Sequence, residues 1–415
     1  YTRETVPSPN DKVFEIHQIV ELANHTMLIA KDGSEIPIED TAAPIFDENG
    51  IVTGCVLVFR DSSERKERQK RIEYLSYHDQ LTELYNRHFF EEELRRLDVE
   101  RNLPLSIVYA DVNGLKVIND AFGHEYGDML LVSVADAMKA ACRADDIIAR
   151  IGGDEFLILL PRTDAVQANC IVERLKQQIA VVRVNGMSAS VSLGLEIKTD
   201  ISQNTTDIMN HAEQNMYQEK ISGTGGYRSI VIQEVFEALV QKTPWAQAHS
   251  DRVRDLCVMM GHAFDLPPAD INDLRIAGEL HDIGKVSLSV DLLSKNGTLD
   301  EKEWVLMKKH PETGYRLLGT CSEFYTIADI VLSHHERIDG TGYPMQLKGD
   351  NINWKSRILA VAEAYDVMVH AQPYRAALSK EAAITELIRN KGTQFDAAIV
   401  DAFVQKVAGN IPEDF

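Results

Sequence analysis

The stretch His334-His335-Glu336-Arg337-Ile338-Asp339-Gly340-Thr341-Gly342-Tyr343-Pro344 decides the fold that we expect for the C-terminal part of this chain. Two adjacent imidazoles stand beside a carboxylate and two glycines, which places metal-ligand chemistry next to a backbone that can turn sharply. A purely structural loop rarely needs that combination. The stretch therefore predicts one half of a metal site, whose other ligands must come from elsewhere in the chain.

The length and composition of the chain set the first limits. At 415 residues it is too long for a single core, so we expect about two to three domains. A hydrophobic share of 44% and a charged share of 26% are typical of a globular protein. No apolar run approaches the ~18 residues that a membrane helix needs, so we expect no membrane segment. Because the chain begins at Tyr1 rather than Met, we also expect that it was cut from a longer protein.

The charge balance favours some ligands over others. The formal net charge of -21 argues against a nucleic-acid polymer as a partner, because phosphate binding needs a basic face. An acidic chain suits divalent cations, and a phosphate-bearing ligand must then be held by a metal or by local basic side chains. The five cysteines are far apart and form no CxxC pair, which is typical of reduced thiols and predicts a cytoplasmic protein.

The N-terminal part predicts strands. Residues 29–60 alternate apolar and polar positions around Gly33 and a turn at residues 47–50, which predicts two strands joined as a hairpin. Three runs resemble the C-terminal half of a PAS sensor domain: Lys31-Asp32-Gly33-Ser34-Glu35-Ile36-Pro37-Ile38, Ala43-Pro44-Ile45 and Val56-Leu57-Val58-Phe59-Arg60-Asp61. The resemblance assigns residues 1–61 to the C-terminal part of an α/β PAS domain.

A charged run over residues 62–78 predicts a helix between two domains. A solvated helix is the simplest interpretation, because too few heptads carry apolar a and d positions for an autonomous coiled coil. Its position favours a signalling helix that connects the domains. A short dimer seam stays open.

Strands alternate with helices from residue 79 to about residue 227. Asp111 follows a buried strand over residues 105–110, and Asp154 lies in a turn after Gly152-Gly153. A Gly-Gly turn alone is usually a surface turn. Two acids held side by side, however, are what a two-cation site for nucleotidyl transfer needs, because carboxylates hold Mg²⁺ and the cations neutralise phosphate charge.

The wider pattern resembles the GGDEF family of diguanylate cyclases. Gly152-Gly153-Asp154-Glu155-Phe156 matches the family signature, and Asp111-x-Asn-x-x-Lys116-x-x-Asn119-Asp120-x-x-Gly123-His124-x-x-Gly127-Asp128 matches its upstream motif. The resemblance implies an α/β domain over residues 79–228, with a palm-like sheet and flanking helices, that joins two GTP molecules into cyclic di-GMP. It also implies the site roles: Asp111 and Asp154 bind Mg²⁺, Glu155 supports metal and substrate, Asn119 and Asp128 read guanine, and Lys116 and Lys220 contact the substrate.

The same resemblance implies a product-inhibition site at Arg143 and Asp146, to which Arg174 on the following helix contributes. Two residues depart from the family pattern. Glu83 stands where glycine is usual, and Thr224 stands where an arginine commonly contacts phosphate. These departures predict weaker cyclase turnover with GTP binding retained.

The C-terminal part predicts helices. A Gly-rich stretch at residues 222–226 predicts the end of the preceding domain, a linker helix follows over residues 229–243, and helical patterns continue through residues 244–415. Histidines and acids now fall at helical positions. Taken singly, each histidine is more often a core or surface residue than a ligand. The set comprises His249, His281, Asp282, His310, His334, His335 and Asp366.

As a set these residues resemble the HD-GYP family of metal-dependent cyclic di-GMP phosphodiesterases, with His281-Asp282-Ile283-Gly284-Lys285 and the stretch at residues 334–344 as its hallmarks. The resemblance implies an all-α helical bundle that holds two divalent metals, iron or manganese. Trp245 stands where some members place a glutamate for a third metal, so we expect two. The implied ligands are Asp282 as the bridge, His249, His281 and Asp366 at one metal, and His310, His334 and His335 at the other.

The two resemblances also imply which residues act on substrate. Asp282 and Lys285 are expected to be catalytic in the bundle, as Asp154 and Glu155 are in the cyclase site. The remaining implied substrate contacts are Lys285 and Arg375, which hold phosphate oxygens, and the loop residues Gly340, Gly342 and Tyr343, which close on the substrate.

The sequence therefore predicts a multidomain enzyme that both makes cyclic di-GMP from GTP and hydrolyses it to pGpG or GMP. Synthesis should need a homodimer, because one cyclase domain contributes one GTP-bearing half-site. Two alternatives stay open. The GGDEF domain is a GTP-binding regulatory module for the phosphodiesterase, or the whole chain is a non-catalytic signalling scaffold.

Overall fold

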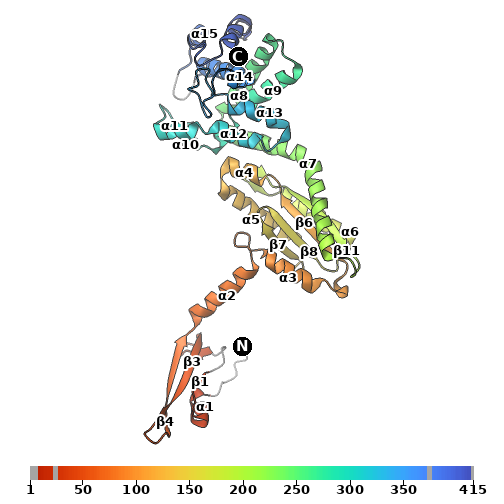
Figure 1. Ribbon diagram of the computed structural model, residues 1–415, viewed down its shortest axis with the longest axis vertical. Coiled ribbons are helices and arrows are strands. Elements are labelled where there is room, and N and C mark those ends of the chain that lie inside the picture. The colour runs from red at the N-terminus through yellow and green to blue at the C-terminus, as the bar shows by residue number, and fades with distance from the viewer. Residues whose placement is uncertain (1–7, 22–26, 372–375, 413–415) are drawn as a thin grey trace. The chain divides into compact units, whose positions relative to one another are not determined.

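The structure, a computed structural model, describes residues 8–21, 27–371 and 376–412. These residues belong to two compact units, residues 1–89 and residues 90–415. Figure 1 labels many of their helices and strands, which are numbered in chain order. No described helix is both long enough and apolar enough to cross a membrane.

The first unit is built around one antiparallel sheet. Strand β3 pairs with β1 and β2 and also with β4, so it is the centre of the sheet. The two connections are tight: Ala30 N donates to Ser34 O, and Asp47 N donates to Ile51 O. This confirms the predicted hairpin and its two turns. The elements are α1 (Pro9–Ile16), β1 (Val20–Glu21), β2 (Met27–Ile29), β3 (Glu35–Phe46), β4 (Val52–Asp61), α2 (Ser63–Tyr77) and β5 (Tyr85–Asn86).

Glu83 lies in the turn between α2 and β5 with φ of 56°, the left-handed region that disfavours residues with a Cβ atom. Its side chain is exposed and its backbone N donates to Asp79 O at 3.0 Å. This is the position where the sequence departs from an expected glycine. The backbone conformation explains why glycine suits the position.

An antiparallel sheet forms the core of the first part of the second unit. Within this unit the strand order is β11-β6-β8-β7, and β6 is buried along its whole length. Helices α4, α5 and α6 and the start of α7 accompany the sheet, as predicted for an α/β domain. The bounds are β6 (Leu105–Val112), β7 (Ile147–Gly152), β8 (Glu155–Leu160), β9 (Arg183–Val184), β10 (Met187–Ser188), β11 (Val191–Lys198), α3 (Arg87–Leu97), η1 (Glu100–Asn102), α4 (Leu115–Phe122), α5 (His124–Ala141) and α6 (Ala165–Ala180).

Helix α7 (Thr205–Lys242) runs for 38 residues without interruption. The Gly-rich stretch at residues 222–226, which predicts a break, therefore lies inside a helix. Its N-terminal half packs on β11 and its C-terminal end contacts η2 of the helical region. Packing at both ends outweighs the low helix propensity of glycine.

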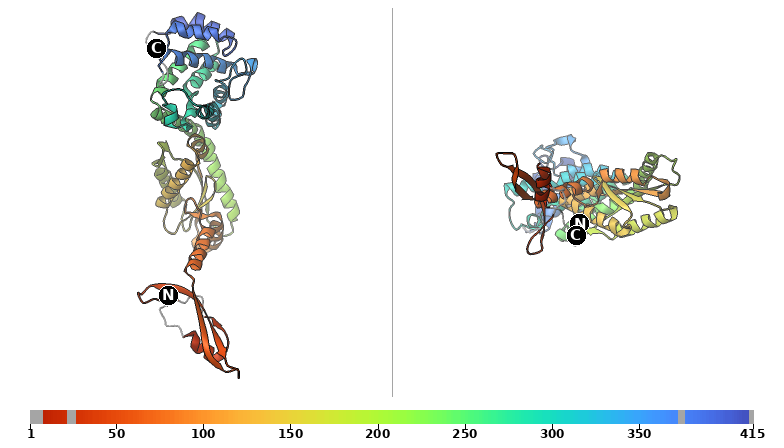
Figure 2. Two further views of the ribbon diagram at one scale, coloured as in Figure 1. Left: turned by 90° about the vertical axis from the view of Figure 1, so that its left-hand side faces the viewer. Right: turned by 90° about the horizontal axis from the view of Figure 1, so that it is seen from below.

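No strand follows β11 among the described residues, and Figures 1 and 2 show only helices there. Helix α8 packs on both α9 and α14 through fully buried side chains such as Val253, Leu274 and Val361. The predicted helical bundle is confirmed. Its elements are α8 (Trp245–Ala263), α9 (Pro268–Leu280), η2 (Ile283–Ser287), α10 (Val290–Leu293), α11 (Glu301–Met307), α12 (His310–Leu318), η3 (Ser322–Phe324), α13 (Tyr325–Leu332), η4 (Gly349–Asn351), α14 (Trp354–Val369), α15 (Lys380–Arg389), α16 (Ala397–Ala402), η5 (Phe403–Val407) and η6 (Ala408–Asn410).

Candidate functional site

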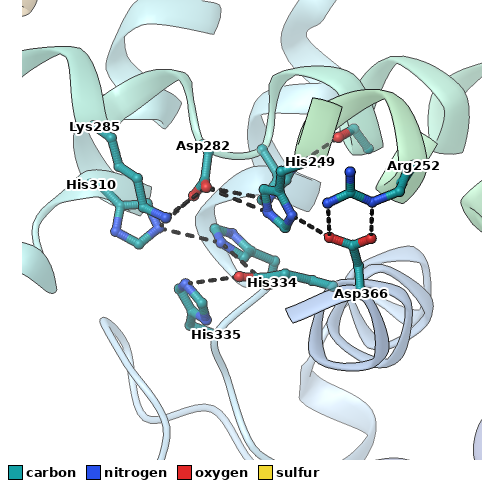
Figure 3. A network of polar contacts seen from close by, with 11 residues as sticks. His249, Arg252, Asp282, Lys285, His310, His334, His335 and Asp366 are labelled. Atoms are coloured by element: carbon teal, nitrogen blue, oxygen red, sulfur yellow. Dashed lines mark hydrogen bonds and ion pairs between the residues drawn. The ribbon is translucent and has the colours of Figure 1, made fainter. Parts of the chain in front are cut away.

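Five histidines from four segments converge inside the helical bundle, as Figure 3 shows for the four that it labels. His249 lies on α8, His281 directly after α9, His310 at the start of α12, and His334 with His335 directly after α13. The rings are packed together: the centroids of His310 and His335 are 4.9 Å apart, and those of His334 and His335 are 4.0 Å apart. All of these positions except His335 are buried. The structure thus brings together the histidines that the sequence predicts.

The hydrogen bonds of the rings fix which nitrogen carries the proton. Each imidazole that donates from Nδ1 keeps a lone pair on Nε2, which is the arrangement found in metal-ligating histidines. Three rings donate from Nδ1 to the carbonyl oxygen three residues earlier: His281 to Gly278 at 2.9 Å, His310 to Met307 at 2.8 Å and His334 to Val331 at 2.5 Å.

As a consequence, lone pairs face one another. Nε2 of His249 lies 3.2 Å from Nε2 of His281, and Nε2 of His310 lies 3.4 Å from Nε2 of His334. Two nitrogen lone pairs that face each other at such distances repel each other. A cation between each pair removes the repulsion, so the donor set fits two metal ions.

Asp282 lies between the two pairs. Its Oδ2 is 3.8 Å from His249 Nε2 and 3.5 Å from His281 Nε2, whereas its Oδ1 is 3.5 Å from His310 Nε2. Oδ1 is buried and accepts no hydrogen bond from the described residues. Lys285 Nζ donates to Oδ2 at 2.6 Å. One carboxylate oxygen therefore faces each pair of histidines, which is the geometry of a bridging ligand.

The protonation states suit metal binding. Burial lowers the pKa of His281 to about 4 and those of His310 and His334 to about 3, so these rings are neutral at pH 7. Burial opposes ionisation of Asp282, but Lys285 and the neighbouring imidazoles hold its pKa well below the usual range. The centre therefore offers neutral nitrogens around one permanent negative charge.

Glu363 on α14 is a member of this cluster that sequence reasoning missed. Its Oε1 is 3.8 Å from His335 Nε2, and its Oε2 is 3.9 Å from His334 Nε2. Its ligand atom lies within 4.8 Å of those of His249 and His281 in one group, and of Asp282 and His334 in another. Burial, together with Asp282 and Asp366, raises the pKa of Glu363 to about 8. The available signal was helical spacing, since Glu363 precedes Asp366 by three residues and shares its face.

Asp366 was expected to be a metal ligand, but its carboxylate lies behind His249. Oδ2 accepts from His249 Nδ1 at 2.7 Å, and Oδ1 accepts from Arg252 Nε at 2.6 Å (Figure 3). His370 Nδ1 is a further 3.0 Å contact of Oδ1. Among the described residues, no ligand group includes Asp366. Its position is that of a group that orients His249.

The loop after α13 is held rigidly beside the histidines. The Tyr343 ring lies over His335 with centroids 4.8 Å apart, and Glu336 accepts from the backbone N of Met345 at 2.6 Å. A Cβ atom on Gly342 would lie 2.4 Å from Arg337 N, so only glycine allows this close backbone approach. Gly340 has φ of 83°. The glycines therefore let the loop fold tightly against the site.

A cavity of about 680 Å³ opens onto the cluster. His334, His335 and Glu363 form one wall, and Gly342 and Tyr343 of the loop form another. This size falls in the range of sites for ligands of several hundred daltons. Arg375 lies outside the described residues.

A second group of acids lies at the end of β6. Lys220 Nζ donates to Asp111 Oδ1 at 2.7 Å, Val112 N donates to the backbone O of Asp154, and Asp111 pairs with Glu155 across the strands. Burial and the neighbouring carboxylates raise the pKa of Glu155, and burial raises that of Asp111 although Lys220 opposes it. Three acids that repel one another at one sheet edge fit a cation such as Mg²⁺.

The expected guanine-reading residues lie on neighbouring helices. Asn119 Oδ1 is buried and has no hydrogen-bond partner in the part of the chain that the structure describes. A Cβ atom on Gly127 would lie 2.0 Å from this oxygen, so the absence of a side chain at Gly127 makes room for the carboxamide. Asp128 follows on α5, and both Asp128 and Lys116 are exposed. An unpaired amide oxygen beside an exposed carboxylate leaves acceptors for a base.

The expected product-inhibition residues also lie together. Arg143 N donates to Asp146 Oδ2 at 2.7 Å, and Arg174 Nε donates to Ala141 O at 2.7 Å. Burial raises the pKa of Asp146, while Arg143 and Arg174 oppose the rise. Both arginine side chains are exposed.

Comparison with known families matches the two parts of the chain separately. Residues 76–225 match the family described as diguanylate cyclase, GGDEF domain, and residues 234–399 match the family described as HD domain.

Curated relatives differ in how much of the chain they match. The chain is 34% identical over 319 residues to the cyclic di-GMP phosphodiesterase response regulator RpfG of Xanthomonas campestris pv. campestris, covering 76% of this chain and 71% of that protein. It is 34% identical over 174 residues to 3'3'-cGAMP-specific phosphodiesterase 3 of Vibrio cholerae, covering 42% of this chain and 38% of that protein. It is 34% identical over 160 residues to the bifunctional diguanylate cyclase/cyclic di-GMP phosphodiesterase MucR of Pseudomonas aeruginosa, covering 37% of this chain and 23% of that protein. The chain thus spans less than half of the last two.

Proposed function

Because the chain belongs to the family of HD-domain cyclic di-GMP phosphodiesterases and also carries a GGDEF domain, we propose that its helical bundle hydrolyses cyclic di-GMP and that its GGDEF domain makes it from GTP. The observation that carries the hydrolytic half is the convergence of unprotonated imidazole nitrogens on the two oxygens of Asp282. Burying so many nitrogen lone pairs that bind neither a proton nor a metal costs free energy of folding.

Two divalent cations, iron or manganese, are the proposed cofactors of the bundle. His249, His281 and Glu363 would hold one, His310, His334 and His335 the other, and Asp282 both. Such cations supply Lewis acidity and an acidified water to a phosphodiester. In this assignment Glu363 takes the ligand position that the sequence assigns to Asp366, and Asp366 with Arg252 orients His249.

The protein side chains have separate tasks. Lys285, whose ammonium lies 2.6 Å from Asp282, is placed to hold a phosphate oxygen beside the bridge. Tyr343 keeps the His335 ring in place by packing against it at a tilt. Arg375 is proposed to bind phosphate from the family resemblance alone. The substrate is a cyclic dinucleotide. The names of RpfG and of phosphodiesterase 3 differ in whether this dinucleotide is cyclic di-GMP or cGAMP.

For the cyclase half, Asp111 and Asp154 would bind Mg²⁺ with Glu155 in support. The support for this assignment is the mutual repulsion of these acids and the ion pair that Lys220 makes with Asp111. Asn119 and Asp128 would read guanine, and Lys116 would contact phosphate. Because each domain holds one GTP, synthesis requires a homodimer. Arg143, Asp146 and Arg174 would bind product and limit synthesis.

One contact favours the regulatory alternative for the GGDEF domain. Helix α4, which carries Asn119, packs against both η2 and α12, the elements that carry Lys285 and His310. Lys242 at the end of α7 donates to the backbone O of Val286 in η2 at 2.5 Å and lies 5.8 Å from the Phe122 ring of α4. Nucleotide binding at α4 would therefore act directly on η2, the segment that carries Lys285.

Product analysis tests these assignments. Purified protein with measured iron or manganese content is incubated separately with GTP and with cyclic di-GMP, and the products are chromatographed. Asp282→Asn should abolish hydrolysis and keep synthesis, whereas Asp154→Asn should do the reverse. Metal-loaded protein that leaves cyclic di-GMP intact would sink the phosphodiesterase proposal. GTP binding that yields no product but changes the hydrolysis rate favours the regulatory role.

A further inference from the structure

The cavity over the metal cluster has walls that no part of the proposed metal chemistry uses. A cyclic dinucleotide carries two phosphates and two bases, and the metal face can engage one phosphate at a time. The rest of the ligand must lie against the remaining lining. Part of that lining comes from Trp304 on the short helix α11 and from Lys308 directly after this helix.

Trp304 is 46% exposed, although tryptophan is usually buried to a large extent. Its helix is nevertheless well anchored: Asp300 and Glu303 form a capping box, and Lys295 pairs with Glu303 at 2.6 Å. The indole is thus an open aromatic face on a fixed support. Such a face is suited to stacking with a nucleobase.

Lys308 lies one helical turn after Trp304, since its backbone N donates to Trp304 O at 3.0 Å. Positions four residues apart share a helix face, so both side chains point to the same side. The Lys308 ammonium is 5.5 Å from the centroid of the Tyr343 ring, which itself packs against His335. Among the residues that the structure describes, Lys308 forms no ion pair with a carboxylate, so its charge is available to a phosphate.

We propose that Trp304 and Lys308 bind the half of the cyclic dinucleotide that is not being cleaved: the indole stacks on one base and the ammonium pairs with the second phosphate. This rests on the proposed phosphodiesterase function. Stacking recognises any base, so the pair sets affinity for cyclic dinucleotides as a class and does not separate guanine from adenine.

Two substrates separate this role from a structural one. Cyclic di-GMP uses the whole cavity, whereas bis(p-nitrophenyl) phosphate has neither a nucleobase nor a second phosphate. Trp304→Ala should raise KM for cyclic di-GMP by about fivefold or more, with kcat nearly unchanged, since stacking on an aromatic side chain is worth at least about a fivefold change in affinity. Its kinetics with the aryl diester should equal those of wild type. Trp304→Phe should restore most of the affinity.

Lys308→Met should also raise KM for cyclic di-GMP alone, and it should weaken the dependence of KM on salt. The matched control is Trp354→Ala, because Trp354 is 40% exposed but lines a different cavity. That variant should keep the wild-type KM for both substrates. The metal content of every variant is measured alongside.

The outcomes are distinct. An unchanged KM for cyclic di-GMP in Trp304→Ala and Lys308→Met overturns the proposed subsite, as does an equal loss with both substrates. Wild-type protein that cleaves the aryl diester but no cyclic dinucleotide overturns the proposed activity on cyclic dinucleotides, and the subsite with it. Wild-type cleavage of cyclic di-GMP with a raised KM in the two variants, and not in Trp354→Ala, supports both.

Discussion

Nδ1 of His249 and Oδ2 of Asp366 lie 2.7 Å apart, and this pair turns Nε2 of His249 toward His281. Asp366 is itself held by Arg252. The acid that the sequence assigns to a metal thus contacts His249 from behind, while Glu363, one helical turn earlier, faces His334 and His335. The distinction between the two acids can be measured.

Glu363→Gln should lose metal from one centre and abolish hydrolysis, because an amide is a poor ligand for a divalent cation. Asp366→Asn should keep the ligand set and bind metal about 10- to 100-fold more weakly, as removal of an outer hydrogen-bond partner usually does. Metal titration with elemental analysis distinguishes the two. If Asp366→Asn loses a full equivalent of metal while Glu363→Gln retains it, the roles are reversed.

Metal binding should release a proton from Glu363. Because burial raises the pKa of this carboxyl to about 8, it is mostly protonated at pH 7 and must ionise to bind a cation. Metal affinity should therefore increase as the pH rises toward 8. Calorimetry of metal binding in two buffers with different ionisation enthalpies measures the proton release. Glu363→Gln is the control, and an equal proton release in that variant would contradict the assignment.

Acid should destabilise the metal-free bundle. His281, His310 and His334 have folded-state pKa values of about 3 to 4 against an ordinary value of 6.5, so the unfolded chain binds more protons between these limits. The free energy of unfolding must then fall as the pH drops from about 6.5 toward 4. Glu363, whose pKa is raised in the folded state, increases the free energy of unfolding as the pH drops toward 4.5. It is one group against three histidines, so the net change is still a loss of stability. Thermal unfolding in chelator at constant ionic strength checks this, and a flat profile would contradict it.

Glu83→Gly should stabilise the protein by about 1 kcal/mol, because the residue occupies the left-handed region and its side chain is exposed. Glu83→Ala is the matched control: it removes the charge and keeps the Cβ atom, so it should bring no gain. Thermal unfolding of the three proteins measures both effects. An equal gain in both variants would assign the effect to the charge instead of the backbone.

The sequence predicted the parts of the site that depend on local order. His281 and Asp282 are adjacent, as are His334 and His335, so each pair reaches the centre together once its segment is placed. The choice between Glu363 and Asp366 depends on how α14 is rotated against α8, and helical spacing leaves that open. The break predicted at residues 222–226 was wrong, because packing of α7 on β11 at one end and on η2 at the other keeps the helix continuous. No sequence pattern marked Trp304 and Lys308 as ligand-binding residues, since their proposed role depends on a cavity formed by distant segments.

The pairing of His249 with Asp366 joins positions 117 residues apart in the chain. A cation shared by His249, His281 and Glu363 would close the same long loop and would act much as a reversible cross-link does in a protein without disulfides. Loss of metal would then loosen the whole bundle along with its chemistry. The cellular lifetime of the enzyme would follow the supply of the ion as closely as its activity does.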